Sequence, residues 1–79
     1  MGKSYKIKIK SVEELKEFVS DMEKVEGEVD VKEGRRVVDG KSILGLASLN
    51  LQRELEVKPI VRDNENREKF EKMIEKYRK

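Results

Sequence analysis

The chain has 79 residues, which is room for one small domain. Hydrophobic residues make up 35% of the chain and aromatic residues 5%, so we expect a small, aliphatic core. Charged residues make up 46% but nearly cancel to a net charge of +2, which argues against a nucleic-acid-binding surface. The sequence has no cysteine and no histidine, which excludes disulfides, thiolate metal sites and the commonest catalytic bases. We therefore expect no enzyme, no metal and no cofactor.

The same composition sets expectations about location. No run of about 18 apolar residues occurs, so we expect no membrane span. The residues that follow Met1 lack the apolar core of a signal peptide. The absence of cysteine fits a reducing compartment. We expect a cytoplasmic monomer that forms one domain over residues 1–79.

A strand and a helix are predicted in the N-terminal part. Residues Tyr5–Lys10 alternate between apolar side chains and lysine, which predicts a strand with one buried face. We interpret the lysine face as a solvated sheet face rather than an RNA platform, because Tyr5 lies on the opposite side. Ser11 and Glu14 have the spacing of a capping box, which predicts a helix from Ser11 to about Lys24. The expected core-facing residues of this helix are Val12, Leu15, Phe18, Val19 and Met22.

The middle of the chain predicts a β-hairpin. Residues Glu28–Lys32 alternate as a strand, and Arg36–Asp39 form the returning strand. Gly34 supplies the positive φ that the turn between them needs. Because Val37 and Val38 are both apolar, we expect the second strand to be covered on more than one side.

A short helix is predicted next, with Ser42 as its N-cap. The expected core-facing residues are Ile43, Leu46 and Ala47. Because Ile43 and Leu44 are adjacent, a short helix cannot bury both, and we expect one of them to stay near solvent. Asn50 is a candidate for a left-handed residue that ends the segment.

The C-terminal part predicts a strand and a closing helix. Residues Leu55–Lys58 alternate, and Pro59 is expected at the end of the strand or on an unpaired side. An N-cap is available within residues 63–66. The expected core-facing residues of the closing helix are Phe70, Met73, Ile74 and Tyr77.

The stretch Asp39–Gly45, followed by Ser48 and Leu49, resembles the regulatory-serine segment of HPr, the histidine-containing phosphocarrier protein of the bacterial sugar phosphotransferase system. The likeness extends more loosely over nearly the whole chain, through Phe18-Val19, Val29–Val31 and Gly34–Asp39. It implies an α/β open-faced two-layer sandwich with the order strand, helix, strand, strand, short helix, strand, helix. The four strands would form an antiparallel sheet with all helices on one face. A ferredoxin-like plait has a similar order, but its second helix is normally longer.

The resemblance also implies where the family's active site would lie. A gap-free count back from the serine segment puts Ser11 near the place of the phosphorylated histidine, and Glu13 near that of an arginine. Ser11 lacks the nucleophilic nitrogen of histidine, and Glu13 and Glu14 would repel a phosphoryl group. We therefore expect that the protein is no phosphohistidine carrier and interpret Ser11 as a helix cap.

A regulatory role for Ser42 is what the resemblance implies about function. In the family this serine is phosphorylated by a dedicated ATP-dependent enzyme, HPr kinase. The modified protein then acts as corepressor for a transcriptional regulator in carbon catabolite repression. The partner-binding residues that the resemblance implies are Lys41, Ser42, Ile43, Leu44 and Ala47. The alternative is a structural or engineered scaffold domain without signalling, because abundant Lys and Glu also occur in engineered proteins.

Overall fold

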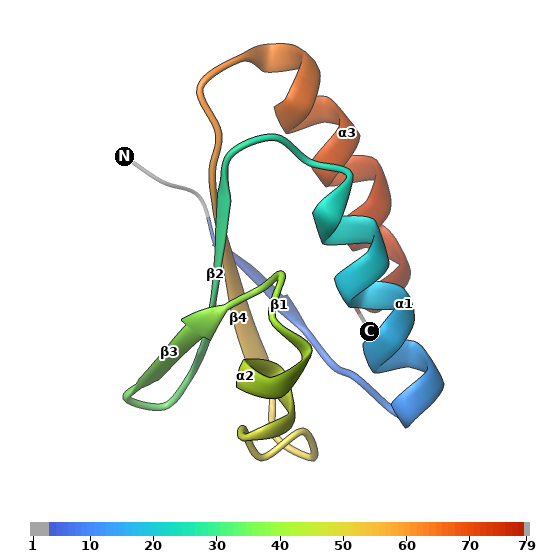
Figure 1. The fold of residues 1–79 in the computed structure, drawn as a ribbon, viewed down its shortest axis with the longest axis vertical. Helices are drawn as coiled ribbons and strands as arrows, with labels where there is room; N and C mark the ends of the chain where they lie inside the picture. The colour runs from blue at the N-terminus through green and yellow to red at the C-terminus, as the bar shows by residue number, and fades with distance from the viewer. Residues whose placement is uncertain (1–3, 79) are drawn as a thin grey trace.

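The computed structural model describes residues 4–78, and its elements follow the predicted order (Figure 1). The elements are β1 (Tyr5–Ile7), α1 (Val12–Glu23), β2 (Glu28–Glu33), β3 (Arg36–Asp39), α2 (Ile43–Ala47), β4 (Leu55–Ile60), α3 (Asn64–Ile74) and a final 3-10 turn, η1 (Glu75–Tyr77). The first strand is shorter than predicted, but its alternation continues beyond its end, since Ile9 is still buried.

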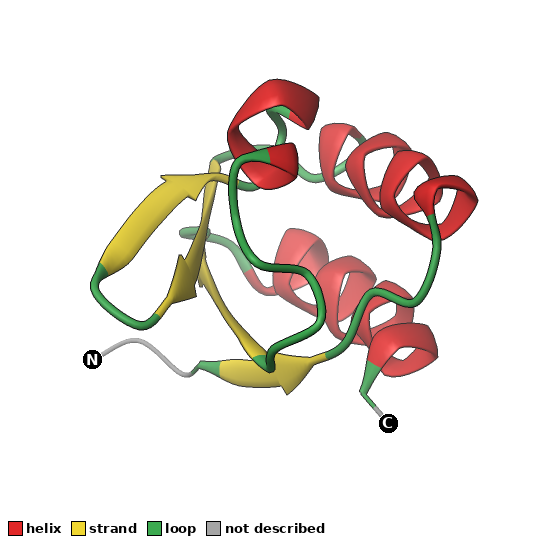
Figure 2. Cartoon of the chain, turned by 90° about the horizontal axis from the view of Figure 1, so that it is seen from below, coloured by secondary structure: helices red, strands yellow, loops and turns green. Residues whose placement is uncertain are grey.

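The four strands form one antiparallel sheet in the order β1-β4-β2-β3. The helices lie on one side of this sheet and leave its other face open (Figures 1 and 2). The register aligns Tyr5 with Val57, Val57 with Val31, and Val31 with Val38. These four side chains form a row across the sheet that faces the helices, because paired residues share a face. The predicted open-faced sandwich is therefore confirmed.

The core is built largely from the helix residues that were predicted to face it. Its buried members on the helices are Leu15, Phe18, Val19, Met22, Leu46, Phe70, Ile74 and Tyr77. Two edge-to-face aromatic pairs pack within this core: Tyr5 and Phe70 join the sheet to α3 with ring centroids 5.3 Å apart, and Phe18 and Tyr77 join α1 to η1 with centroids 5.2 Å apart. Val12 was expected in this core but is 64% exposed. The reason is its place as the first residue of α1, where its side chain lines an open cavity.

Of two further expectations about strands, the one on Val37 is corrected and the one on Pro59 is confirmed in one of its two alternatives. Val37 is 57% exposed, because β3 is an edge strand and only one face of the sheet is covered. Pro59 does not end its strand, because β4 continues to Ile60, and it pairs with Val29 of β2 on one side. The described pairing of β1 with β4 ends at Val57, so among the described residues Pro59 has no strand partner on its other side, which is the second of the two predicted places.

The predicted turns and caps are largely confirmed. Gly34 has a φ of 62° and is the first of two residues between the paired Glu33 and Arg36, as in a type II′ hairpin. The hydroxyl of Ser11 accepts a hydrogen bond from the backbone N–H of Glu14 at 3.1 Å. The Glu14 carboxylate accepts in return from the Lys10 N–H at 2.8 Å, one residue before the usual capping-box position.

The closing helix begins at a confirmed N-cap, but the left-handed residue expected before β4 is absent. Asp63 caps α3 through a hydrogen bond from the Asn66 N–H. Asn50 was expected to be left-handed, yet no non-glycine residue in the described part of the chain has a positive φ.

A buried carboxylate fixes the C-terminal turn to α1. Asp21 accepts a hydrogen bond from the Tyr77 hydroxyl at 2.8 Å and pairs with the Lys76 ammonium at 2.8 Å. The hydrogen bond with Asp21 raises the pKa of Lys76, and burial is the main cause that raises the pKa of Tyr77. Both groups therefore keep their protons at neutral pH, and η1 stays attached to the first helix.

We expect the stability of the protein to depend on the core-facing residues of the helices and not on the lysines of the N-terminal strand. Leu15→Ala or Ile74→Ala should lower the free energy of unfolding by about 2–5 kcal/mol, because each leaves a cavity in the core. Lys8→Ser should change it by less than about 0.5 kcal/mol, because Lys8 is exposed. Urea denaturation measures all three variants, and the reverse order of effects would show that the faces are wrongly assigned.

Candidate functional site

The predicted regulatory serine caps the short helix. The backbone of Ser42 is extended, and its hydroxyl oxygen accepts a hydrogen bond from the Gly45 N–H at 3.1 Å. The Ser42 N–H donates to the Asp39 carbonyl at 3.0 Å, which forms the tight turn between β3 and α2. The side chain thus lies at the positive end of the α2 backbone, half-buried. Ser42 as N-cap is confirmed; its phosphorylation stays a prediction.

The side chains of α2 are not buried and exposed in the way that the sequence predicted. Leu46 is fully buried, whereas Ile43 is 41% exposed and Ala47 is also exposed. The expectation that all three face the core is therefore wrong: Leu46 is the one residue of this five-residue helix that is buried. Leu44 is 82% exposed, so the prediction that one of the two adjacent residues stays near solvent is confirmed.

Gly45 allows α2 to lie close to the sheet. A Cβ at this position would be 3.2 Å from the Cβ of Val38 on β3. This separation is shorter than ordinary van der Waals contact, so a side chain here would require α2 or Val38 to move by a few tenths of an ångström. Glycine therefore suits the close approach of α2 to β3.

Lys41 precedes Ser42 but points elsewhere. Its ammonium donates to the carbonyl of Val25 at 2.6 Å and to the carbonyl of Gly27 at 2.7 Å. Both carbonyls belong to the loop that follows α1. The partner-binding role of Lys41 stays a prediction, while the contacts that the structure gives its ammonium are within the chain.

The corner at Ser11 lies beside the loop that leaves α2. A surface cavity of about 440 Å³ opens here, lined by Lys8, Ile9, Lys10, Ser11, Val12, Leu51 and Gln52. The Ser11 hydroxyl serves as the cap of α1, and Glu13 and Glu14 occupy the first turn of that helix. The structure therefore brings Ser11 next to residues 51–52. Its correspondence to the family's histidine stays a prediction.

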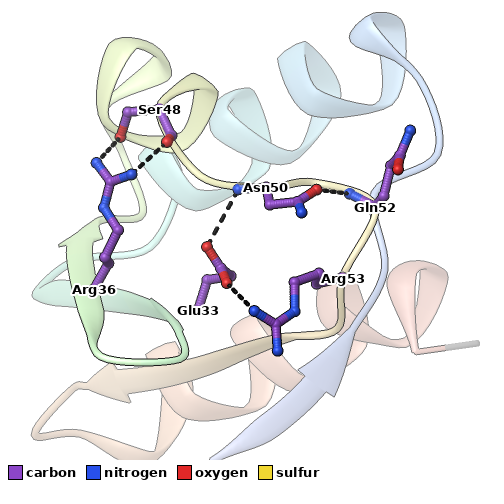
Figure 3. A network of polar contacts seen from close by, with 6 residues as sticks. All are labelled: Glu33, Arg36, Ser48, Asn50, Gln52 and Arg53. Carbon is purple, nitrogen blue, oxygen red and sulfur yellow. Dashed lines mark hydrogen bonds and ion pairs between the residues drawn. The ribbon is translucent and has the colours of Figure 1, made fainter.

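A polar network holds this exit loop against the hairpin (Figure 3). The Arg36 guanidinium donates to the Ser48 carbonyl at 2.8 Å and to the Ser48 hydroxyl at 3.1 Å. The largely buried carboxylate of Glu33 accepts from the Asn50 N–H at 3.3 Å and pairs with Arg53 at 3.2 Å. The end of α2 and the loop after it are thus both fixed by side chains of the β2–β3 hairpin.

Sequence reasoning missed this network. It placed Glu33 in the turn, whereas Glu33 is the last residue of β2 and lies in phase with the buried Val29 and Val31. The alternation of the strand could have identified it. No such signal exists for Arg36 and Arg53, whose partners lie 12 and 20 residues away in sequence.

Two features are absent from residues 4–78, the part of the chain that the structure describes. No group of three metal-ligating side chains within this range is placed to hold an ion. No helix in the same range is both long and apolar enough to cross a membrane.

We expect Glu33→Ala to destabilise the protein by about 1–3 kcal/mol, because the Asn50 N–H loses its acceptor. The pair with Arg53 should contribute little of this, since the Arg53 side chain is 66% exposed. Glu28→Ala is the matched control: Glu28 begins the same strand, is exposed, and should change stability by less than about 0.5 kcal/mol. Equal effects in urea denaturation would contradict the role of the network.

Comparison with known proteins adds one similarity. No protein-family model matches the chain, and no curated protein matches it. Among solved structures, it is similar to the crystal structure of HPr-C-His from Thermoanaerobacter tengcongensis, with a TM-score of 0.70 and 22% sequence identity. The similarity covers 92% of this chain and 91% of that chain. Together with the strand order and the open sheet face, it shows that the chain has the fold of HPr.

Proposed function

We propose that this HPr-like domain is a regulatory module related to the phosphotransferase system and acts through the Ser42 segment. A kinase of the HPr kinase type phosphorylates Ser42, and the modified domain binds a transcriptional regulator in carbon catabolite regulation. The observation that carries the proposal is the highly exposed Leu44 two residues after a serine that caps a helix. The proposal implies a cytoplasmic monomer whose partners are proteins.

The two helix N-termini at the candidate sites differ in their charge, and this supports Ser42 as the modified residue. The first turn of α1 carries Glu13 and Glu14, which already interact with the positive end of that helix. The first turn of α2 carries no acidic residue. A phosphoryl group on Ser42 would add about −1.5 to −2 charges at the favourable end of the helix. The same charge at Ser11 would meet two carboxylates.

The apolar surface beside Ser42 supports a protein partner. Leu44 and Ile43 are both exposed and adjacent, and exposed apolar side chains favour protein–protein contact. Ala47 is also exposed on this helix. A partner that covers Leu44 would therefore lie next to the phosphoryl group and could contact both that group and the apolar side chain.

Phosphohistidine transfer is a different chemistry, and we propose that this protein does not perform it. The sequence contains no histidine. Ser11, at the corner where the family's histidine is expected, uses its hydroxyl as a helix cap. A serine oxygen does not form the phosphoramidate that phosphohistidine transfer requires.

Incubation with HPr kinase and ATP tests the proposal. We expect intact-protein mass spectrometry to show one added phosphoryl group, and peptide mapping to place it on Ser42. Ser42→Ala should abolish the addition. Ser20→Ala is the matched control, because Ser20 is an exposed serine of α1, outside the α2 segment, and this variant should be phosphorylated normally.

A second arm uses phosphoenolpyruvate and the first enzyme of the phosphotransferase system. We expect no acid-labile phosphoryl adduct. Detection of such an adduct would refute the proposed loss of phosphoryl carriage. Failure of the kinase arm would instead favour a scaffold domain without signalling.

We expect Leu44→Glu to fold normally and to abolish binding to the regulator or kinase. The side chain is 82% exposed, so the free energy of unfolding should change by less than about 0.5 kcal/mol. A pull-down with the phosphorylated domain measures binding. Val37→Glu is the matched control, because Val37 is an exposed valine on β3, outside α2.

The outcomes of this comparison separate three possibilities. An unfolded Leu44→Glu variant would mean that the residue belongs to the core. A folded variant that binds normally would exclude α2 as the interface. Equal loss in Val37→Glu would place the interface on the sheet as well.

A further inference from the structure

We propose that Lys41 is a positioning residue that fixes the turn carrying Ser42 against the loop after α1. Its ammonium donates to the carbonyls of Val25 and Gly27 at 2.6 Å and 2.7 Å, and we call this pair of hydrogen bonds the latch. Hydrogen bonds from a charged donor are stronger than those between neutral groups. The latch itself rests on these contacts alone; its effect on Ser42 modification rests on the proposed function.

The loop at one end of the latch is held independently of Lys41. Gly27 has a φ of 105°, and a Cβ at this position would lie 2.7 Å from the Ile60 carbonyl oxygen, so the loop passes close to the end of β4. The Glu26 N–H donates to the buried side chain of Asn66 at 3.1 Å. The two carbonyls are therefore fixed acceptors, and an ammonium bound to both has a defined position.

The turn between β3 and α2, at the other end of the latch, is also held by backbone hydrogen bonds of the residues on either side of Lys41. The Gly40 N–H donates to the Val29 carbonyl at 2.7 Å, and the Ser42 N–H donates to the Asp39 carbonyl at 3.0 Å. The Lys41 N–H donates to the Asp39 carboxylate at 2.9 Å. Lys41 is thus the one residue of this turn whose side chain ties it to the loop after α1.

The position of the Ser42 hydroxyl follows from the latch. Ser42 is the next residue after Lys41, and its oxygen must stay aligned with the Gly45 N–H to cap α2. A turn released from the loop could tilt, and the cap would open more often. The same geometry directs the Lys41 ammonium toward the loop carbonyls and not toward the Ser42 hydroxyl.

Three variants of the full chain test the latch. Lys41→Met nearly keeps the length of the side chain but removes its side-chain donors, and Lys41→Arg keeps side-chain donors. Lys58→Met is the matched control, because Lys58 is an exposed lysine of β4 and makes no ion pair or side-chain hydrogen bond among the described residues. Backbone amide hydrogen exchange followed by NMR reports the opening of the cap through Gly45 and global unfolding through the amides of β4.

We expect Lys41→Met to reduce the protection of the Gly45 amide at least about tenfold, while the protection of β4 stays unchanged. Lys41→Arg should lose less protection than Lys41→Met, and Lys58→Met should lose none. Unchanged Gly45 protection in Lys41→Met would overturn the proposal. Equal loss at Gly45 and β4 would also overturn it, because Lys41 would then support the whole fold and not the turn.

Phosphorylation kinetics with HPr kinase distinguish two roles of Lys41: positioning Ser42 within the domain, or contacting the kinase directly. If Lys41 acts through Ser42, Lys41→Met should lower kcat more than it raises KM, together with the loss of Gly45 protection. A rise in KM with intact Gly45 protection would show that Lys41 contacts the kinase, and would refute the latch. Reduced protection in Lys41→Met, with no phosphorylation of the unaltered protein, would leave the latch established and refute the proposed function instead.

Discussion

Burial of one face of the sheet requires that β4, the last strand in the chain, lie between β1 and β2. Val57 is the central contact of this arrangement, because it pairs with Tyr5 on one side and Val31 on the other. All three side chains face the helices and are buried. A shift of the register by one residue would turn this row toward solvent, so the apolar pattern specifies the pairing strongly.

This constraint determines what the connection between β3 and β4 must do. The chain has to leave the edge strand, cross the end of the sheet and return to its centre, and α2 with its exit loop makes this crossing. The segment buries little apolar surface beyond Leu46 and Leu49. Polar contacts supply the remaining restraints, at the start through Lys41 and at the end through Arg36 and Glu33. A short helix can therefore hold exposed apolar side chains in fixed positions.

The contrast between α1 and α2 supports the proposal that Ser42, and not Ser11, is the site of phosphate chemistry. Both helices begin with a serine cap, but only α1 has carboxylates in its first turn. These carboxylates stabilise the helix and disfavour an anion at the same place. Leu44 adds an exposed apolar side chain to the helix whose first turn has no carboxylate.

Features that depend on neighbouring residues could be predicted from the amino-acid sequence. The caps at Ser11, Ser42 and Asp63 each involve an N–H three residues away in sequence. Gly34 supplies the positive φ that the hairpin turn requires. The apolar spacing gave the order of the elements, because periods of two and 3.6 residues differ clearly. The similarity of the serine segment to HPr then selected among folds with that order.

Which side chains are covered, and which polar groups meet, depends on how the elements pack in three dimensions. Val12, Val37 and Ala47 fit apolar patterns, yet each is exposed: Val12 begins α1, Val37 lies on an edge strand and Ala47 ends α2. Lys41 looked like a surface lysine, but the loop after α1 presents two carbonyls within its reach. Such contacts join residues distant in sequence, and their geometry exists only once the sheet register and the helix positions are set.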